Sequence, residues 1–435
     1  MPQDINCNFA AMKTNRYFLL ILISMSLTSV GAQTRRMTID EADSIATCHN
    51  LRIKASRLDI DAAEGQLKQA KAYDNPEVQL MHNVQNPINR KWFDTGRDGQ
   101  TDIQVSQPIA IGGQHRNKVR QAKAMLKSSQ AAHDATMLDV RHETRTTFVE
   151  LYNAQQKLKV YDKEITSAER IYEAYSNQTD KGNVSRIQTF RIATMLNQLR
   201  SEKAELQLYA DELQMQLCLL LDIPAGESIE AQLDEEAEIR TVIDNLTKLQ
   251  PLVASANTDL IQAIVQNHPE ITQAKYQEEN AHHALKAEKA EALPRIAVNG
   301  EWDKNGSIGH NFFAVGVTLS IPIWNHNKGN IRAAKAQHAQ AAIERQHKEN
   351  ELQTSLFTHY RATMLSLKRV DEQKQQLSAD LDLLLEAAEQ QFLKRNISVI
   401  EFVDLYSSYR DTRFQMEDAK AQLLKSNEEL KKYTR

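Results

Sequence analysis

The side chains that could carry out chemistry are scattered along this 435-residue chain instead of clustered. Its 13 histidines include His115, His326 and the neighbours His282 and His283, but none has a second ligand at metal-site spacing beside a cysteine or carboxylate cluster. Neither a nucleophile elbow nor a phosphate-binding loop occurs. We therefore expect a protein that is not an enzyme and that holds no metal and no cofactor, and we interpret nearly all of the histidines as solvent-facing.

One pair of acids stands where it could act on ions. In the segment 398–404, Ser398 is followed by Glu401 and Asp404, whose spacing of three residues places both carboxylates on one face of a helix. Taken without further context, the same spacing is also typical of a solvated surface pair that contributes little.

The N-terminus has the pattern of an exported protein. A basic region precedes an apolar stretch at 18–23, and small residues at 30–32 form a cleavage site before Gln33. We predict a signal peptide over 12–32, with Met12 as an alternative start to Met1. No later stretch reaches the roughly 18–20 apolar residues that a membrane-crossing helix needs. If the exported chain enters a membrane, it does so with β-strands.

Charge and cysteine usage exclude other classes. The net charge is −4 with acidic and basic residues intermixed, which argues against a nucleic-acid partner. Cys48 and Cys218 lie in helical patterns without a second cysteine at CxxC spacing, so we expect two buried small side chains instead of a redox pair.

Two stretches, 105–124 and 317–336, share one transition from strand to helix, and the chain is organised around them. Each has an alternating β run, a proline, a turn rich in Gly or Asn, and a basic helix start. We expect the junctions at Pro108, Gly112 and Gly113 in one copy and at Pro322, Trp324 and Gly329 in the other. Two tandem copies of one unit are therefore predicted.

Each copy is predicted to run helix, strand, strand, helix, helix. The first covers 33–222 with strands at about 77–86 and 102–109, and the second covers 258–435 with strands at about 295–303 and 311–320. An acidic, irregular linker over 223–257 separates them. A capping box of Thr38 and Glu41 begins a helix that should reach about Tyr73. The stretch from Gln114 to about Tyr175 lacks Gly and Pro and predicts a helix of about 90 Å, followed by a return helix in a coiled-coil hairpin.

The predicted strands are long enough to cross a bilayer in a tilted barrel. Each has one apolar face, and we expect Trp302 on it with Ile296 and Val298. The other face carries Glu77, Gln79, Gln104, Ser106, Thr318 and Ser320. Four strands cannot close a barrel, so several chains should contribute to one. A soluble four-stranded sheet on a helical bundle is the alternative, but it leaves the signal peptide and the duplication unexplained.

The repeated layout, the segment Ser-Gln-Pro-Ile-x-x-Gly-Gly-Gln at 106–114 and Gly-Asn-Val-Ser at 182–185 resemble the TolC family of outer-membrane efflux channels. The resemblance covers nearly the whole mature chain. It implies a mainly α protein with membrane β-strands: a homotrimer with a twelve-stranded barrel in outer-membrane lipid and a long periplasmic α-barrel of coiled-coil hairpins. It also implies a Gram-negative bacterium, a periplasmic adaptor (membrane fusion) protein and an inner-membrane pump of the resistance-nodulation-division type.

The segment 319–331 is similar to the branch of this family that serves cobalt, zinc and cadmium efflux pumps. That branch usually shows Pro-Leu-Phe-Asp-Arg-Asn-Gln-Gly-Asn there, and this chain departs from it at Trp324, Asn325, His326 and Lys328. Heavy-metal cation efflux through a passive exit duct is therefore the expected function. A multidrug or general small-molecule channel is the alternative, and a periplasmic coiled-coil adaptor or scaffold is the alternative from another class.

The resemblance also suggests a role for the acids at 401 and 404. In the TolC pattern, the acids of a Ser/Thr-Ile-Val-Asp-x-x-Asp run narrow the periplasmic entrance, and the run from Ser398 to Asp404 matches it with Glu401 in place of the first Asp. The equivalent positions of the first copy are Gln188 and Arg191. In the trimer that the resemblance implies, threefold symmetry would stack these acids as carboxylate rings, which favour cations. We expect Ser398, Glu401 and Asp404 to form the periplasmic gate, with Arg191 as a partner for Asp404 where neighbouring hairpins meet.

Overall fold

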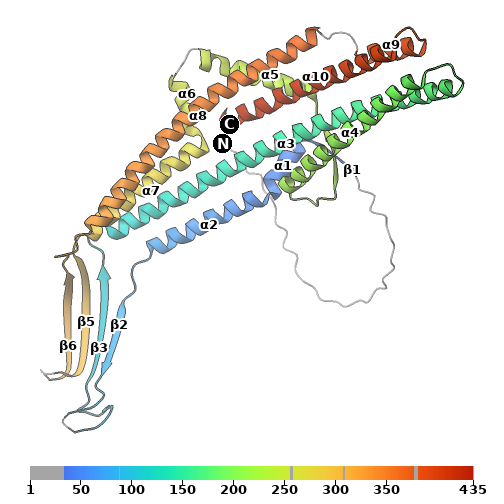
Figure 1. Cartoon of the computed structure of the whole chain (residues 1–435). Coiled ribbons are helices and arrows are strands. Elements are labelled where there is room, and N and C mark those ends of the chain that lie inside the picture. Colours follow the sequence, from blue (N-terminus) through green and yellow to red (C-terminus); the bar gives the residue numbers. More distant parts are fainter. Residues whose placement is uncertain (1–33, 88, 255–257, 307–308, 377–380, 435) are drawn as a thin grey trace, which may run out of the picture.

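The computed structural model describes residues 34–87, 89–254, 258–306, 309–376 and 381–434. The molecule is elongated, with a sheet at one end and long helices that run away from it (Figure 1). The predicted signal peptide 12–32 lies outside the described residues. Within the described ranges, no helix combines the length and the apolar character that a membrane crossing requires.

The N-terminal half contains two helices before the sheet instead of the single one expected. The predicted capping box is present at the start of α1 (Ile39–His49), where Thr38 and Glu41 exchange hydrogen bonds. Asn50 then interrupts the helix, because its side-chain oxygen accepts hydrogen bonds from the amides of Arg52 (2.8 Å) and Ile53 (3.4 Å) and so caps α2 (Leu51–Lys71). The prediction of one helix to about Tyr73 was wrong at this asparagine.

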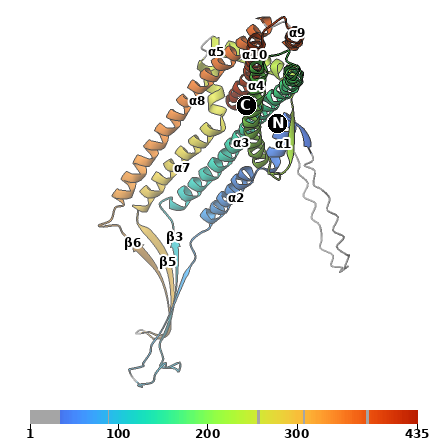
Figure 2. The same cartoon turned by 45° about the vertical axis from the view of Figure 1, so that its right-hand side comes forward.

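Long hairpins form the body of the molecule. Helix α3 (Gln114–Asp180) has 67 residues, which corresponds to about 100 Å, and α4 (Arg186–Leu221) returns along it. In the second half, α7 (Pro269–Glu291) leads to the sheet, α8 (Lys328–Gln376) leaves it, and α9 (Leu381–Leu393) and α10 (Val399–Thr434) form the second hairpin. Both hairpin tips lie far from the sheet (Figures 1 and 2).

The sheet contains both predicted hairpins side by side. Strands β2 (Glu77–His82), β3 (Thr101–Ile109), β5 (Arg295–Gly306) and β6 (Gly309–Ser320) pair in the order β2-β3-β5-β6, all antiparallel. The β3–β5 pairing joins the two hairpins. Strand β2 ends at His82, four residues before the predicted end, because the chain beyond it bends into a loop with an isolated bridge between Gln85 and Trp92.

Asp94 organises the loop between β2 and β3. Its carboxylate accepts hydrogen bonds from the side-chain amides of Asn86 (3.1 Å) and Asn89 (2.5 Å) and from the amide of Gly96 (3.0 Å). Lys304 of the second hairpin donates to the carbonyls of Thr95 and Gly96, both at 2.8 Å. The tip of the first hairpin is therefore attached to the second.

The described part of the segment between the two halves forms regular secondary structure, which corrects the prediction of an irregular linker over 223–257. Strand β4 (Ser228–Gln232) pairs in parallel with β1 (Thr34–Thr38), and α5 (Glu235–Ala254) and α6 (Thr258–Asn267) follow. The carboxylate of Asp234 accepts from the amide of Ala237 at 3.1 Å. Helix α5 is stabilised by burial of an apolar stripe at helical spacing, made of Ile239, Val242, Leu246 and Leu249.

Two apolar clusters hold the helices together. The larger surrounds Phe148 and Leu151 of α3 and includes residues of α1, α4, α5, α8 and α10. The smaller lies nearer the tips, where the predicted coiled-coil residues Tyr161 and Ala168 pack with Phe392 and Phe402. Cys218 is buried as predicted, whereas Cys48 is exposed, which corrects the expectation for that residue.

Candidate functional site

Cross-strand pairing gives the sheet two chemically different faces. Directly opposed residues of antiparallel strands share a face, and one row joins Leu80, Ile103, Trp302 and Phe313. The side chains of this face are open to the surroundings, and Val315 is 86% exposed. The apolar face consists of Val78, Leu80, Ile103, Val105, Gln107, Ile109, Ile296, Val298, Gly300, Trp302, Phe313, Val315, Val317 and Leu319. The predicted shared face of Ile296, Val298 and Trp302 is thus observed.

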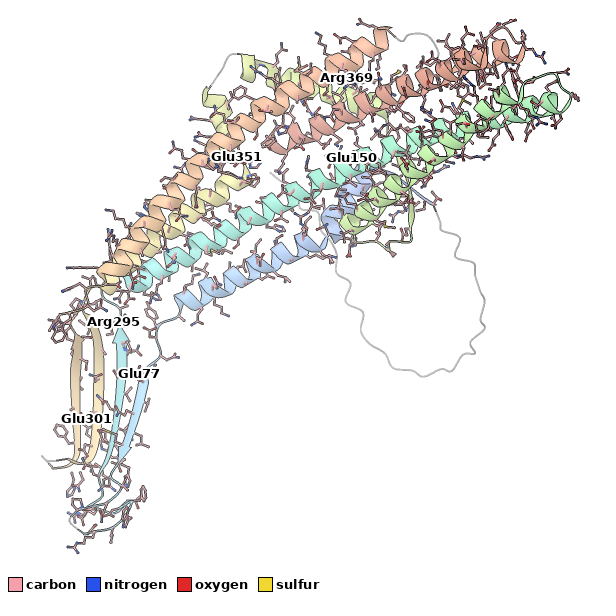
Figure 3. The ribbon with its side chains drawn as sticks, viewed as in Figure 1. Glu77, Glu150, Arg295, Glu301, Glu351 and Arg369 are labelled. Atoms are coloured by element: carbon pink, nitrogen blue, oxygen red, sulfur yellow. The ribbon has the colours of Figure 1, made fainter. Side chains whose placement is uncertain are left out.

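The opposite face is polar. One of its rows joins Gln79, Gln104 and Glu301, and the side-chain amide of Asn299 donates to the hydroxyl of Thr318 at 2.6 Å. In Figure 3, Glu77 and Glu301 lie along the sheet and Arg295 lies at its helix end. The charged members of this face are Glu77, Asp102, Arg295, Glu301 and Asp303.

The two edge strands are paired on one side only. Within the described chain, β2 pairs with β3 alone and β6 with β5 alone, so each presents a row of backbone donors and acceptors to the outside. The sheet therefore has an apolar face, a polar face and two edge strands whose outer backbone groups could pair with further strands.

The first strand-to-helix junction depends on glycine. Gly113 has φ +80° and precedes α3, a backbone conformation that glycine adopts without steric cost. At Gly112, an added Cβ would lie 2.7 Å from Leu293 Cδ1, so a larger residue would displace the Leu293 side chain just after the end of α7. Pro108 lies within β3, opposite Ala297, beyond the last residue that pairs with β2. Its missing N–H therefore falls where the strand has a neighbour on one side only.

The second junction uses side-chain hydrogen bonds to the same helix. Asn327, with φ +54°, donates from its side chain to the carbonyl of Glu288 (2.9 Å) and to the Glu288 carboxylate (2.6 Å). In the first junction, Gln114 donates to the carbonyl of Ala290 at 2.9 Å. The last turns of α7 thus anchor both junctions. Sequence reasoning missed Gln114 and Asn327, because nothing in the pattern indicates that α7 is their acceptor.

The other predicted junction residues have smaller roles within one chain. Trp324 is 92% exposed between β6 and α8, and Pro322 lies in the same connection. Gly329 lies in the first turn of α8 with open space around it, so no close approach requires glycine there.

At the second hairpin tip, the structure brings two of the four predicted gate residues together. The amide of Ser398 donates to the carboxylate of Glu401 at 2.7 Å, and the amide of Glu401 donates to the hydroxyl of Ser398 at 3.2 Å. This capping box lowers the pKa of Glu401, through the hydrogen bond from the Ser398 amide and then that from its hydroxyl. Asp404 is exposed on the next turn. Arg191 is exposed on α4, and the described part of this one chain contains no ion pair between it and Asp404.

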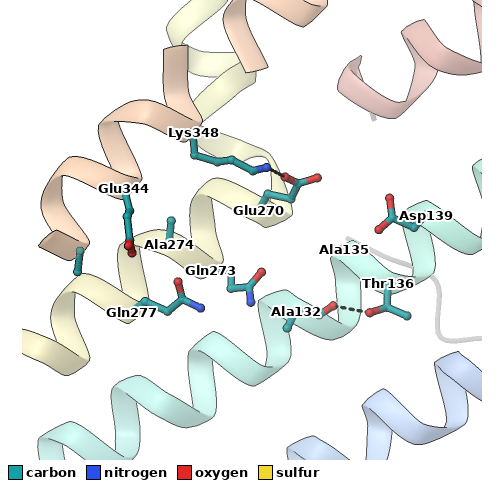
Figure 4. Close-up of a pocket in the computed structure, with 11 residues that line it drawn as sticks. Ala132, Ala135, Thr136, Asp139, Glu270, Gln273, Ala274, Gln277, Glu344 and Lys348 are labelled. Atoms are coloured by element: carbon teal, nitrogen blue, oxygen red, sulfur yellow. Dashed lines mark hydrogen bonds and ion pairs between the residues drawn. The ribbon is translucent and has the colours of Figure 1, made fainter. Parts of the chain in front are cut away.

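A groove of about 510 Å³ lies between α3, α7 and α8 (Figure 4). Alanines and amides line much of it, including Ala132, Ala135 and Gln273. Its charged residues are engaged, since Lys348 pairs with Glu270 at 2.8 Å and Asp139 with Lys432 at 2.6 Å. These residues offer no nucleophile with an adjacent base, so the groove is a seam between packed helices.

Histidines need one correction. His268 and His283 are buried, 4% and 8% exposed, so the solvent-facing interpretation was wrong for them. His268 caps α7 by accepting from the amide of Glu270 at 3.3 Å. Across the described residues, no three metal-binding side chains converge on one point.

Comparison with known proteins decides the family. The family model of outer membrane efflux proteins matches residues 44–221 and 260–434, most of the chain. The chain belongs to the outer membrane efflux protein family. The predicted location in the outer membrane of a Gram-negative bacterium, with extension into the periplasm, is thereby confirmed, as is the prediction of a non-enzymatic transport protein.

Individual relatives are distant in sequence but close in fold. The cobalt-zinc-cadmium resistance protein CzcC of Cupriavidus metallidurans is 21% identical over 309 residues, which are 71% of this chain and 68% of CzcC. The solved structure of CusC superposes with a TM-score of 0.70 at 15% identity over 91% of both chains. The CmeC outer membrane channel of Campylobacter jejuni gives 0.74 at 14% identity over 91% of this chain and 85% of CmeC. The predicted TolC-like fold class is confirmed.

Proposed function

We propose that three copies of the mature chain, after loss of the signal peptide 12–32, form one passive duct through the outer membrane. The observation that carries this proposal is the two-faced sheet with β2 and β6 each paired on one side. Lipid tolerates no open strand edge, and four strands are too few to close a barrel. Three copies would supply twelve strands, with the apolar face toward lipid and the polar face toward the lumen.

The proposed duct is organised as two repeats, 33–222 and 258–435, joined by the segment 223–257. The long hairpins α3–α4 and α9–α10 continue each wall segment away from the membrane and would form the periplasmic α-barrel. A periplasmic adaptor and an inner-membrane pump of the resistance-nodulation-division type would complete the tripartite system. In this proposal the duct is passive and the pump drives transport.

Extraction from outer-membrane fractions, followed by native mass measurement in detergent, tests the assembly. We expect three chains per particle and loss of residues before Gln33. As a control, the variant Val315→Asp, which places a charge on the apolar face, should reach the outer membrane poorly. The corresponding change on the polar face, Ala314→Asp, should assemble normally. A stable soluble monomer of the parent chain would contradict the proposal.

Divalent heavy-metal cations are the cargo we propose. The likeness to CzcC and the segment 319–331 support this choice. A drug or general small-molecule channel is the second candidate, favoured by the departures at Trp324, Asn325 and His326 from the metal-branch pattern. The adaptor class is set aside, because strands and helices alternate in both halves.

A deletion strain exposed to a panel of metals and drugs separates these candidates. We expect the inhibitory concentrations of Co²⁺, Zn²⁺ and Cd²⁺ to fall, with restoration by the parent gene on a plasmid. A fall in drug tolerance without any change for metals would assign the duct to the second candidate.

A further inference from the structure

His282 of α7 and His338 of α8 face each other across the seam between these two helices. Their ring centroids lie 5.2 Å apart, with an angle of 45° between the ring planes. Both side chains are partly exposed, so ions can reach them from solvent. This pair is separate from the tip acids and from the sheet.

Contacts on either side fix the register that brings the two histidines together. Toward the sheet, Asn327 is hydrogen-bonded to Glu288 at 2.9 Å and 2.6 Å. Toward the middle of the molecule, Arg345 pairs with Glu278 at 2.7 Å. The antiparallel helices cannot slide between these two anchors, so the imidazoles are held opposite one another before any ion arrives.

The separation of the rings suits coordination of one ion. A metal about 2.0–2.1 Å from an imidazole nitrogen lies about 3.2 Å from the ring centroid, and a tetrahedral angle then places two centroids about 5 Å apart. The observed 5.2 Å agrees with this value.

His283 does not belong to the pair. Its Nε2 lies 3.7 Å from the Glu279 carboxylate, and the charge of Arg120 on α3 also acts on it.

We propose that His282 and His338 form a two-imidazole site for a borderline divalent transition-metal ion such as Zn²⁺, Co²⁺ or Cu²⁺. Because the described residues bring no third metal-binding side chain to the same point, water completes the coordination shell. A site with two protein ligands binds weakly and releases its ion quickly, which suits an ion in transit. That transit role rests on the proposed metal efflux, whereas the binding itself does not.

Electron paramagnetic resonance of substoichiometric Cu²⁺ added to the purified full-length chain tests the site. We expect nitrogen couplings from two imidazoles in the parent and loss of that signal in His338→Ala and in His338→Gln. His347→Ala, which removes an exposed histidine from the same helix, is the matched control and should leave the signal intact. Zn²⁺ should displace the Cu²⁺ from the parent. An identical two-nitrogen signal in both His338 variants would overturn the assignment.

A second readout separates failure of this site from failure of the proposed function. Competition titration should give a Zn²⁺ affinity at least tenfold weaker in His338→Ala than in His347→Ala. If the parent binds Zn²⁺ this way but the deletion strain keeps its metal tolerance, the site stands and metal efflux fails. If metal tolerance is lost on deletion but the parent shows no paired-imidazole binding, the duct function stands and this site is refuted.

Discussion

The α3–α4 hairpin and the α9–α10 hairpin end in similar turns. Different residues occupy the left-handed position in the two turns. In the first tip, the side-chain amide of Asn183 donates to the side chain of Gln178 at 2.9 Å, and in the second, that of Asn396 donates to Gln391 at 2.6 Å. The residue before each asparagine has a left-handed backbone, with φ +76° at Gly182 and +64° at Arg395. Only the first tip uses glycine, for which this conformation has little cost.

The helices that follow the two tips, α4 and α10, also differ in how their first turns are capped. After the first tip, Ser185 accepts one hydrogen bond, from the amide of Ile187 at 3.3 Å. After the second, Ser398 and Glu401 form a complete capping box. The second tip therefore holds a carboxylate in a fixed position at the end of the molecule, where the first tip has Gln188. The comparison teaches that only the second tip fixes an acid at the helix start, and we propose that this acid also faces the ion path.

The largest expected effect concerns the interface between the hairpins. Glu164 of α3 is fully buried, and both of its carboxylate oxygens are without a hydrogen-bond partner in the described part of the chain. Two acids of α9, in contrast, accept hydrogen bonds from tyrosines of α10. Tyr406 donates to Glu389 at 2.8 Å, and Tyr409 donates to Asp382 at 2.5 Å. Burial raises the pKa of Glu164 to about 8, against the attraction of Arg410 and with repulsion from Glu202 and Asp411.

This raised pKa predicts a pH-dependent stability. The folded chain disfavours the ionised carboxylate. The contribution of Glu164 to the free energy of unfolding is therefore fully present below pH 4.5 and is lost as pH rises toward 8. Glu164→Gln should remove a stability loss on the order of 3 kcal/mol between pH 5 and pH 8. Thermal denaturation followed by circular dichroism should show a smaller fall in midpoint for the variant over this range. Equal falls in parent and variant would mean that the carboxyl is solvated.

A smaller effect is expected from exchanging the left-handed residues. Gly182→Ala should destabilise the first tip by about 1 kcal/mol, because a side chain disfavours φ +76°. Arg395→Gly should stabilise the second tip by a similar amount. Amide hydrogen exchange of tip peptides should speed up about fivefold in the first variant and slow down in the second. Changes of the same sign in both tips would break the comparison.

The smallest effect distinguishes the two helix starts. Ser398→Ala removes one half of a capping box and should cost about 1 kcal/mol, whereas Ser185→Ala removes a single long hydrogen bond and should cost about half as much. The exchange rates of the amides at 401 and 187 report these losses. A larger effect at Ser185 would mean that the capping box does not stabilise α10.

Much of this architecture is predictable from local patterns. The strand alternation and the capping box at Thr38 each involve neighbouring residues, and each appears as predicted. Strand β1 pairs with β4, which brings Thr34 opposite Ser228, far away in the sequence. No local sequence pattern predicts this pairing. Asn50 ends α1 through its side chain, although the apolar spacing continues past it.

The candidate gate was predictable only in part. The spacing of Ser398, Glu401 and Asp404 places the acids at the tip, but their convergence into rings, and any contact of Asp404 with Arg191, requires other copies of the chain. Anchors such as Asn327 depend on which helix end lies beside the turn. That information exists only once the helices are packed.

Single-channel recording of the parent and of Glu401→Ala/Asp404→Ala in planar bilayers tests the central claim most directly, namely that the second tip forms the narrow entrance of the duct. The account predicts that loss of the carboxylates reduces cation selectivity and weakens block by multivalent cations about tenfold, with assembly intact. Gln188→Ala, at the equivalent position of the first tip, should change neither property. If the double variant conducts, selects and is blocked like the parent, the acids serve only the helix start and the claim is contradicted.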